Sequence, residues 1–410
     1  MLLSYGKVGR KGVPMEKIYQ HLLYLTGRAL FSVHTEPLPK DIDWQALYQE
    51  SRSQALTLLI FDCLNAEERA AMPPALLEQW KRQALSTLWW NEQILTEQGE
   101  VLHQIRSLGI SCVILKGTSS AISYPNPQLR AAGDIDLLAA PEDRAAIRGL
   151  LEKLGYQPPA DHHHCHDSMA KGKLVVELHW EPNGVPNSAV GNKIRAYLQP
   201  FVRHPQIVDG IPMLPPCPRA VVLLLHKLEH IINTGLGLRQ LCDWAVFVHR
   251  ELTPACWNEL SGLLHTFGLM VFTKVITRIC VDYLSLPAQD APWCMDADAA
   301  LCEELLQDML RTGNFGKKEE RYGQRLFTNP QAKGRISSLL RTGVSACQVH
   351  WPPCKRCPLL LPAAPVALLL RYRKQRKLGQ RPPIHLIQMY HGAAQRQKLN
   401  AALRPFLPTK

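Results

Sequence analysis

The sequence predicts an α+β protein in which a small sheet is flanked by helices, with helical N-terminal and C-terminal regions. Three observations predict this fold class. Residues 15–108 place apolar side chains three to four positions apart, as amphipathic helices do. Residues 110–180 instead combine short β-type runs with helix patterns. Helical spacing returns over residues 219–310.

An apolar stripe in the N-terminal region predicts a helix with one buried face. Two adjacent tryptophans, Trp89 and Trp90, belong to this stripe. We expect them to pack in the core, with stacking on a nucleic-acid base as the alternative. The remaining members of the stripe are Leu76, Leu77, Trp80, Leu85, Leu88 and Leu95.

The central region follows the order strand, helix, strand, helix, strand, which predicts a sheet covered by helices. Small residues end the first strand, and polar and apolar residues alternate at the start of the second, as on a strand with one polar face. Strands are expected at residues 110–115, 134–138 and 173–180, with a short helix up to Tyr124 and another from Pro141 to Gly155.

These patterns divide the chain into four expected regions. They are a helical N-terminal region at 1–108, an α/β core at 109–215, a helical domain at 216–310 and a basic, proline-rich C-terminal region at 311–410.

Composition excludes a wholly disordered chain, because 46% of the 410 residues are hydrophobic and 20% are charged. The formal charge of +12 is unevenly distributed. Residues 311–410 contain 20 Lys or Arg and 2 Asp or Glu, whereas the other 310 residues contain 27 basic and 33 acidic groups. An anionic partner is therefore expected for the tail alone.

The 12 cysteines do not indicate a disulfide framework, since several stand singly in apolar stretches. Residues 1–15 lack the continuous apolar run of a signal peptide. The most apolar run, residues 358–370, is broken by two prolines and is shorter than the ~20 residues that a membrane span needs. We therefore expect a cytoplasmic protein.

The segment Gly133-Asp134-Ile135-Asp136 carries the clearest chemical signal. Two carboxylates one residue apart on a strand point to the same face. Because their charges repel, keeping both ionised costs free energy unless a cation lies between them. Carboxylate oxygens suit Mg²⁺, with Mn²⁺ as the alternative.

A third carboxylate, Glu177, lies between Val176 and Leu178 on the strand KLVVELHW. An acid in such apolar surroundings is costly without a partner. If the two strands are adjacent, the three carboxylates could form a cage for two metal ions, one activating a hydroxyl and the other holding a triphosphate.

A turn of small residues, Lys116-Gly117-Thr118-Ser119, precedes this acidic strand. Gly117 permits close approach of the backbone to a phosphate, and the Thr118 and Ser119 hydroxyls can donate hydrogen bonds to its oxygens. Lys116 or Arg130 could neutralise the phosphate charge. A solvated strand end is the alternative for Lys116.

The order LKG, RxxxDIDLL and VVELHW resembles the DNA-polymerase-β-like nucleotidyltransferase superfamily. Within it, the chain is similar to a poorly characterised bacterial nucleotidyltransferase family with an LKG turn. The resemblance covers residues 109–182 and, more weakly, the chain to about residue 250. It implies a small mixed nucleotidyltransferase-like sheet in the core at 109–215.

The resemblance implies that Asp134, Asp136 and Glu177 are the metal ligands and catalytic carboxylates. Gly117 with Thr118 or Ser119 would replace the Gly-Ser pair of the superfamily. It also implies that the helical half behind the nucleotide cleft contributes His226, His230, Arg239 and Asp243 as substrate-site candidates. His179 is a further substrate candidate, and Arg239 and Asp243 are spaced to pair along a helix.

Three other patterns suggest metal binding, and each has a simpler interpretation. Residues 161–167, DHHHCHD, contain zinc-type ligands, but we expect a loop near the active-site mouth with His166 or His179 touching substrate. Cys354 and Cys357 form a lone CxxC, for which two ordinary thiols are the expectation. The HxxxH of residues 226–230 lacks the glutamate placement of a zinc protease, so we expect a structural or substrate-facing role.

The tail at 351–381 combines a proline-rich apolar run with the basic cluster 371–377. Three interpretations stay open: contact with an anionic membrane surface, binding to the phosphates of a nucleic acid, or a solvated basic arm. A membrane contact would place the protein peripherally at a membrane.

These observations predict an Mg²⁺-dependent enzyme that moves a nucleoside monophosphate from an NTP, expected to be ATP, to an unidentified acceptor hydroxyl. The alternative is a non-catalytic nucleotide-binding or scaffold protein that docks through its basic tail on a membrane or nucleic acid. The altered Gly-Ser turn would then mark lost activity.

Overall fold

The computed structural model describes the main body of the chain and a few C-terminal pieces. The described residues are 15–33, 36, 38–158, 165–233, 235–314, 357–364, 366–367, 369–370, 373 and 398–407. The tail interpretations at 351–381, Cys354 of the CxxC and most of the histidine run at 161–167 therefore fall largely outside the described residues.

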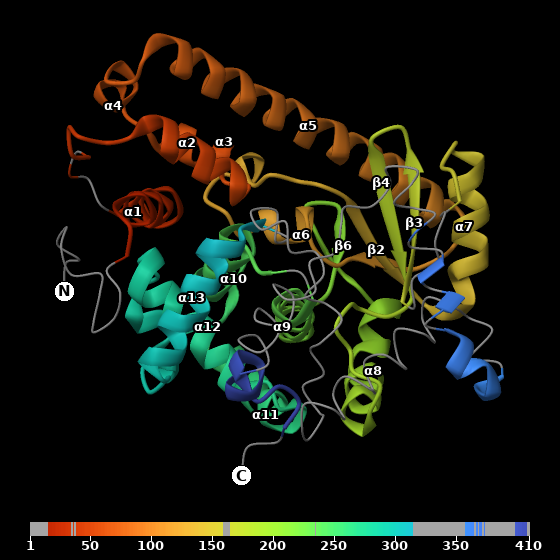
Figure 1. Cartoon of the computed structure of the whole chain (residues 1–410). Helices are drawn as coiled ribbons and strands as arrows, with labels where there is room; N and C mark the ends of the chain where they lie inside the picture. The colour runs from red at the N-terminus through yellow and green to blue at the C-terminus, as the bar shows by residue number, and fades with distance from the viewer. Residues whose placement is uncertain are drawn as a thin grey trace.

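A four-stranded mixed sheet forms the centre of the α/β part, in the order β1-β2-β4-β3 (Figure 1). Strands β2 and β4 are parallel, whereas β1 pairs with β2, and β3 with β4, in antiparallel fashion. Together with the surrounding helices this confirms the predicted α+β fold. The strands are β1 (Cys112–Ile114), β2 (Ile135–Ala139), β3 (His166–Lys171) and β4 (Leu174–His179).

Strand β3 was not predicted, and residues 161–167 were expected to form a loop. His166 and Asp167 instead begin the strand, which pairs along its whole length with β4. Its sequence, HDSMAK, offers few apolar residues, so it gives no clear alternation. The signal that could have found it is Gly172, whose φ of 63° suits a tight hairpin turn.

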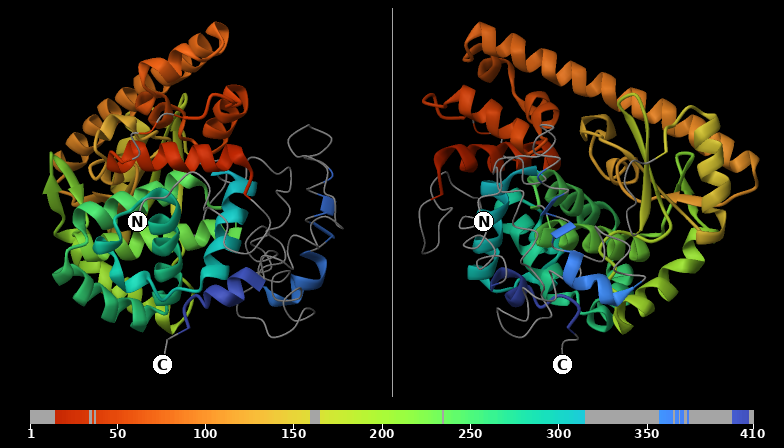
Figure 2. Two further views of the ribbon diagram at one scale, coloured as in Figure 1. Left: turned by 90° about the vertical axis from the view of Figure 1, so that its left-hand side faces the viewer. Right: turned by 45° about the vertical axis from the view of Figure 1, so that its right-hand side comes forward.

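The 34-residue helix α5 (Pro74–Ser107) runs from the N-terminal helices to the sheet (Figures 1 and 2). Its first turns bury Leu76 and Trp80 in the helical core, and its second half buries Ile94 and other residues against the sheet. The predicted stripe is wrong in its middle, where Trp89 is 61% exposed. Both cores pack against the same face of the helix, because its buried residues repeat at intervals of three, four or seven positions along its whole length, and Trp89 lies on the opposite face.

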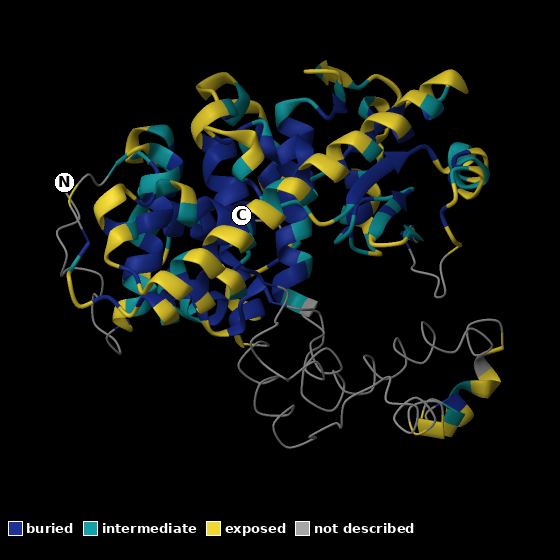
Figure 3. Cartoon of the chain, turned by 90° about the horizontal axis from the view of Figure 1, so that it is seen from above, coloured by how far each residue is buried: buried dark blue, intermediate teal, exposed yellow. Residues whose placement is uncertain are grey.

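The other helices surround a second, larger core. Helix α1 packs against α10 and α12, so N-terminal and later helices share one apolar interior, while exposed residues cover the outer faces (Figure 3). These helices are α1 (Lys17–Phe31), α2 (Trp44–Ser53), α3 (Thr57–Cys63), α4 (Ala66–Ala70), α8 (Ala189–Arg203), α9 (Pro216–Asn233), α10 (Leu238–Glu251), α11 (Pro254–Phe267), α12 (Met270–Leu284) and α13 (Ala299–Thr312).

Several shorter elements complete the fold. Helix α6 (Thr118–Ala121) follows β1, and α7 (Arg144–Lys153) follows β2 as predicted. A small hairpin, β5 (Gln206–Val208) with β6 (Ile211–Met213), was not predicted. Among the described residues, no helix combines the length and apolar character that crossing a bilayer requires.

Trp80 and Trp89 allow a matched test of the two-core arrangement of α5. Trp80 is fully buried, donates its Nε1 hydrogen to the Thr57 carbonyl at 3.0 Å and packs against Tyr48. We predict that Trp80→Ala lowers the free energy of unfolding by about 3–5 kcal/mol. Trp89→Ala should change it by no more than about 0.5 kcal/mol. Denaturant titration measures both, and equal losses would contradict the arrangement.

Candidate active site

Two carboxylates face each other across the parallel strands β2 and β4. The register pairs Asp136 directly with Glu177, so both side chains lie on the same face of the sheet. His179, two residues further along β4, shares that face. Its Nε2 lies 3.1 Å from Asp136 Oδ1 and 3.2 Å from Glu177 Oε2. The imidazole therefore bridges the two acids.

Lys116, at the turn after β1, provides a second positive group. Its Nζ lies 2.9 Å from Asp136 Oδ1 and 3.9 Å from Glu177 Oε2. Burial would lower the pKa of Lys116, but the charges of Asp136, Asp134 and Glu177 outweigh it and raise that pKa. The ammonium group is therefore charged and belongs to the carboxylate cluster, not to a solvated strand end.

The pKa shifts of Glu177 and His179 show that the bridge is an ion pair. Burial would raise the pKa of Glu177, but the hydrogen bond from His179 and the charge of Lys116 lower it to about 2. Burial would lower the pKa of His179, but its interactions with Asp136, with the Cys165 side chain and with Glu177 raise it well above its ordinary value. At neutral pH the two acids are balanced by the charges of Lys116 and His179.

One oxygen of the cluster is left without a partner. Asp136 is completely buried, and its Oδ2 accepts no hydrogen bond from the described part of the chain. A buried carboxylate oxygen without a donor is costly. Its chemistry suits a hard cation, and the ligand atoms of Asp136, Glu177 and His179 lie within 4.8 Å of one another.

Asp134 lies just before β2 and is partly exposed. Its negative charge acts on both Lys116 and Glu177, which places it near the cluster. The structure thus brings Asp136 and Glu177 into direct proximity and places Asp134 at the margin of the same group.

The turn after β1 has the predicted glycine geometry. Gly117 has φ 72° and ψ −111°, and a Cβ there would lie 3.5 Å from the Asp134 carbonyl oxygen. The Thr118 hydroxyl donates to Gln98 of α5 at 2.7 Å, so it is already engaged. Ser119 Oγ is buried and has no hydrogen-bond partner among the described residues. Of the two hydroxyls, Ser119 is the one available to a ligand.

Arg130 pairs with a carboxylate on α10. Its Nε and Nη2 donate to the two carboxylate oxygens of Asp243 at 3.0 and 2.8 Å. The bidentate partner of Asp243 is thus in another segment of the chain and not Arg239 of its own helix. The Tyr124 hydroxyl also donates to Asp243, at 2.8 Å. Arg239 donates to the Ala131 carbonyl at 2.9 Å.

The loop before β2 is therefore held from two sides. On the α10 side, Arg130 binds Asp243 of that helix, and Arg239 of the same helix donates to the Ala131 carbonyl. On the α5 side, Asn91 donates to the Arg130 carbonyl at 3.1 Å and accepts from the Ala132 amide at 2.9 Å. Sequence analysis missed Asn91, because one polar residue in a long helix gives no signal. These contacts position Asp134 and Asp136.

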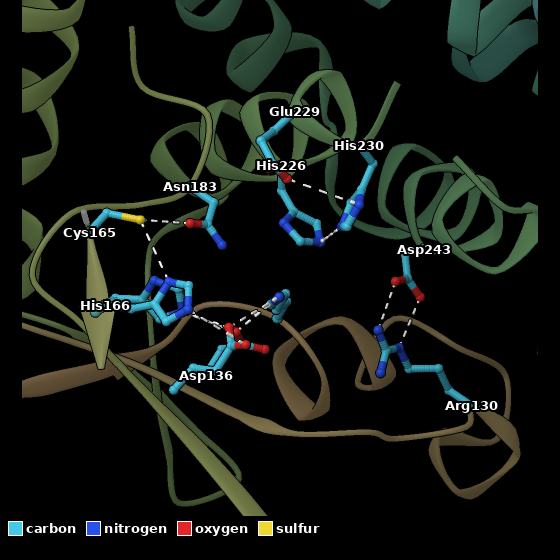
Figure 4. A network of polar contacts seen from close by, with 12 residues as sticks. Arg130, Asp136, Cys165, His166, Asn183, His226, Glu229, His230 and Asp243 are labelled. Atoms are coloured by element: carbon cyan, nitrogen blue, oxygen red, sulfur yellow. Dashed lines mark hydrogen bonds and ion pairs between the residues drawn. The ribbon is translucent and has the colours of Figure 1, made fainter. Parts of the chain in front are cut away.

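His226 and His230 lie one turn apart on α9, with their Nε2 atoms 2.9 Å apart (Figure 4). Burial and the positive charge of Lys116 lower the pKa of His226 well below its ordinary value and that of His230 to about 3. Both imidazoles are neutral at pH 7. The influence of Lys116 on both places this pair beside the carboxylate cluster.

The Glu177–His179 pair predicts that the free energy of unfolding passes through a maximum as the pH is changed. Glu177 has a folded pKa of about 2, below its ordinary 4.5, so its contribution is present above pH 4.5 and is lost as pH falls toward 2. His179 has a folded pKa above its ordinary 6.5, so its contribution is present below pH 6.5 and is lost as pH rises through the folded value. Their joint contribution is greatest between pH 4.5 and 6.5.

Denaturant titration of the metal-free protein across pH measures this profile. Glu177→Gln should reduce the loss of unfolding free energy that occurs as pH falls below 4.5. Glu152→Gln, which removes an exposed carboxylate on α7, should leave that loss unchanged. If Glu177→Gln loses as much unfolding free energy at low pH as the wild type does, Glu177 is not the cause of the acid destabilisation.

The buried Arg130–Asp243 pair predicts a second stability effect. Arg130→Met leaves Asp243 buried without its bidentate partner and should cost on the order of 3–5 kcal/mol of unfolding free energy. Adding Asp243→Leu should recover much of that loss. Arg148→Met, which breaks a more exposed i,i+4 pair on α7, should cost no more than about 1 kcal/mol. Equal effects of the two arginine substitutions would contradict a positioning role for Arg130.

Comparison with known proteins gives one match. Residues 40–285 match the model of a family described as uncharacterised nucleotidyltransferase. This range includes the sheet, the carboxylate cluster and the histidines of α9. No curated protein and no solved structure gave a match. Because the family model covers more than half of the chain, the protein belongs to this nucleotidyltransferase family.

Proposed function

We propose that the protein is an Mg²⁺-dependent enzyme that transfers a nucleoside monophosphate from an NTP, expected to be ATP, to an acceptor hydroxyl, with release of pyrophosphate. The observation that carries this proposal is the carboxylate pair Asp136–Glu177, in which Oδ2 of Asp136 accepts no hydrogen bond from the described residues. The family membership and the resemblance to DNA-polymerase-β-like enzymes support the same reaction class.

The carboxylates of Asp134, Asp136 and Glu177 would hold Mg²⁺, or Mn²⁺ in its place. Their oxygens are the ligands that such ions prefer, and the buried Oδ2 of Asp136 fits that use. When bound, the cation would lower the pKa of the attacking hydroxyl and offset charge on the triphosphate.

Lys116 has two roles in this proposal. Without a cation its ammonium group offsets the repulsion of Asp136 and Glu177. In the loaded site that charge becomes available to nucleotide phosphates, together with the backbone at Gly117 and the Ser119 hydroxyl. Helix α6 is only four residues long, so we assign no helix-dipole contribution to phosphate binding.

Neutral His226 and His230 are weak bases because their pKa values are strongly lowered. We therefore propose that they contact substrate by hydrogen bonding instead of removing a proton. Arg239, tied to the loop before β2, supplies a further positive charge on the helical side. The acceptor hydroxyl is not assigned.

One observation favours the alternative of a non-catalytic nucleotide-binding or scaffold protein. Lys116 and His179 already balance the charges of Asp136 and Glu177, so the carboxylate pair is compatible with folding in the absence of a metal. The two proposals differ in turnover. Only the enzyme releases pyrophosphate.

Incubation of the purified protein with each labelled NTP and Mg²⁺ tests the proposal, with label transfer and pyrophosphate as readouts. Asp136→Asn and Glu177→Gln should each reduce turnover by roughly 100-fold or more. Both should also weaken Mn²⁺ binding, measured separately by electron paramagnetic resonance. Glu152→Gln is the matched control and should leave both quantities unchanged.

Two outcomes would count against the enzyme. Nucleotide binding without pyrophosphate release on any acceptor would support the scaffold alternative. Turnover and Mn²⁺ affinity that survive in both carboxylate variants would remove Asp136 and Glu177 from the site.

A further inference from the structure

A second group of metal-type ligands adjoins the carboxylate cluster. Cys165, His166 and His179 each offer one ligand atom, and these atoms lie within 4.8 Å of one another. Figure 4 shows Cys165 and His166 on the far side of the cluster from the α9 histidines. Cys165 and His179 are each 1% exposed. The proposed nucleotidyl transfer makes no use of the Cys165 thiol.

The sheet explains why three residues from two segments meet here. His166 and His179 are direct partners across β3 and β4, and their ring centres are 4.7 Å apart. The Trp180 amide donates to the Cys165 carbonyl at 3.1 Å, which extends the strand pairing by one residue. Cys165 Sγ then lies 3.6 Å from His166 Nδ1 and also neighbours His179.

His179 is oriented as a metal-bound histidine usually is. It directs Nε2 at Asp136 and Glu177, whereas His166 Nε2 lies 3.8 Å from Glu177 Oε1, beyond direct hydrogen-bond distance. Histidines that bind a metal through one nitrogen commonly donate the other N–H to a carboxylate. The remaining nitrogen of His179, Nδ1, is buried and meets no hydrogen-bond partner among the described residues.

We propose that Cys165 Sγ and the Nδ1 atoms of His166 and His179 bind a zinc-type transition-metal ion. Sulfur and imidazole ligands select such an ion over Mg²⁺, which prefers oxygen. Three protein ligands leave the fourth tetrahedral position to water.

Binding replaces protons with the ion. The thiol of Cys165, which donates to Asn183 Oδ1 at 2.7 Å, gives up its proton, and His179 gives up one of its two. His179 keeps the N–H on Nε2 and continues to donate to Asp136 and Glu177. The ion would thus fix the orientation of the residue that bridges the carboxylates, which makes Cys165 and His166 positioning residues.

Cobalt substitution tests the site in the full-length protein. One equivalent of Co²⁺ should produce a thiolate-to-cobalt charge-transfer band together with the intense visible bands of tetrahedral cobalt. Cys165→Ser should abolish the charge-transfer band, and His166→Gln should weaken Co²⁺ binding by at least about 10-fold. Cys357→Ser is the control and should leave the spectrum unchanged, because it removes an exposed thiol elsewhere.

The same spectrum separates this proposal from the proposed function. Asp136→Asn should reduce nucleotidyl transfer while keeping the charge-transfer band, because Asp136 is not a ligand of the zinc-type ion. If the wild-type spectrum has no thiolate-to-cobalt band, Cys165, His166 and His179 form a hydrogen-bonded network and do not bind a metal ion through sulfur. A band that survives Cys165→Ser, or one that disappears in Cys357→Ser, would assign the metal to other thiols.

X-ray absorption of the zinc-loaded wild-type protein needs no variant and decides the matter if Cys165→Ser does not fold. One sulfur and two imidazole nitrogens around zinc are expected. A shell of oxygen and nitrogen alone, or one with several sulfurs, would overturn the proposal.

Discussion

Asp136 and Glu177 face each other across two parallel strands, and their mutual repulsion has to be offset before this part of the sheet can form. Lys116 and His179 provide that offset, at 2.9 and 3.1 Å from Asp136. The offset is incomplete, because one buried oxygen of Asp136 has no donor within the part of the chain that the structure describes. A site that is balanced in charge but leaves one buried acceptor without a donor suits the proposed exchange, in which a metal ion and its nucleotide replace the contact of Lys116 with Asp136.

Contacts from both hydrophobic cores of the protein hold Asp136 and Glu177 in place. Helix α5 connects the two cores, because the first half of its buried face packs among the helices and the second half packs against the sheet. Asn91 of α5 and Asp243 of α10 fix the two sides of the loop that leads into β2. The nucleotidyltransferase family match spans all of these elements, so the supporting contacts lie within the matched range along with the carboxylates.

Sequence periodicity was sufficient for the α+β class, for β2 and β4, and for the position of Gly117 in a turn. It failed where tertiary contacts decide the outcome. Trp89 is exposed because it lies on the face of α5 opposite the buried residues, and β3 forms because a glycine turn returns the chain along β4. The partner of Asp243 could not be read from spacing, since Arg130 lies more than one hundred residues away. The site roles and region boundaries predicted from the sequence stay predictions.

Crystals of the protein with Mn²⁺ and a non-hydrolysable NTP test the central claim most directly. The account predicts anomalous density for manganese beside the carboxylates of Asp136 and Glu177, with the Lys116 ammonium group on a phosphate oxygen instead of on Asp136. If nucleotide binds while Lys116 keeps its contact with Asp136 and no manganese lies at the pair, the carboxylates are a structural ion pair and the proposed chemistry is wrong.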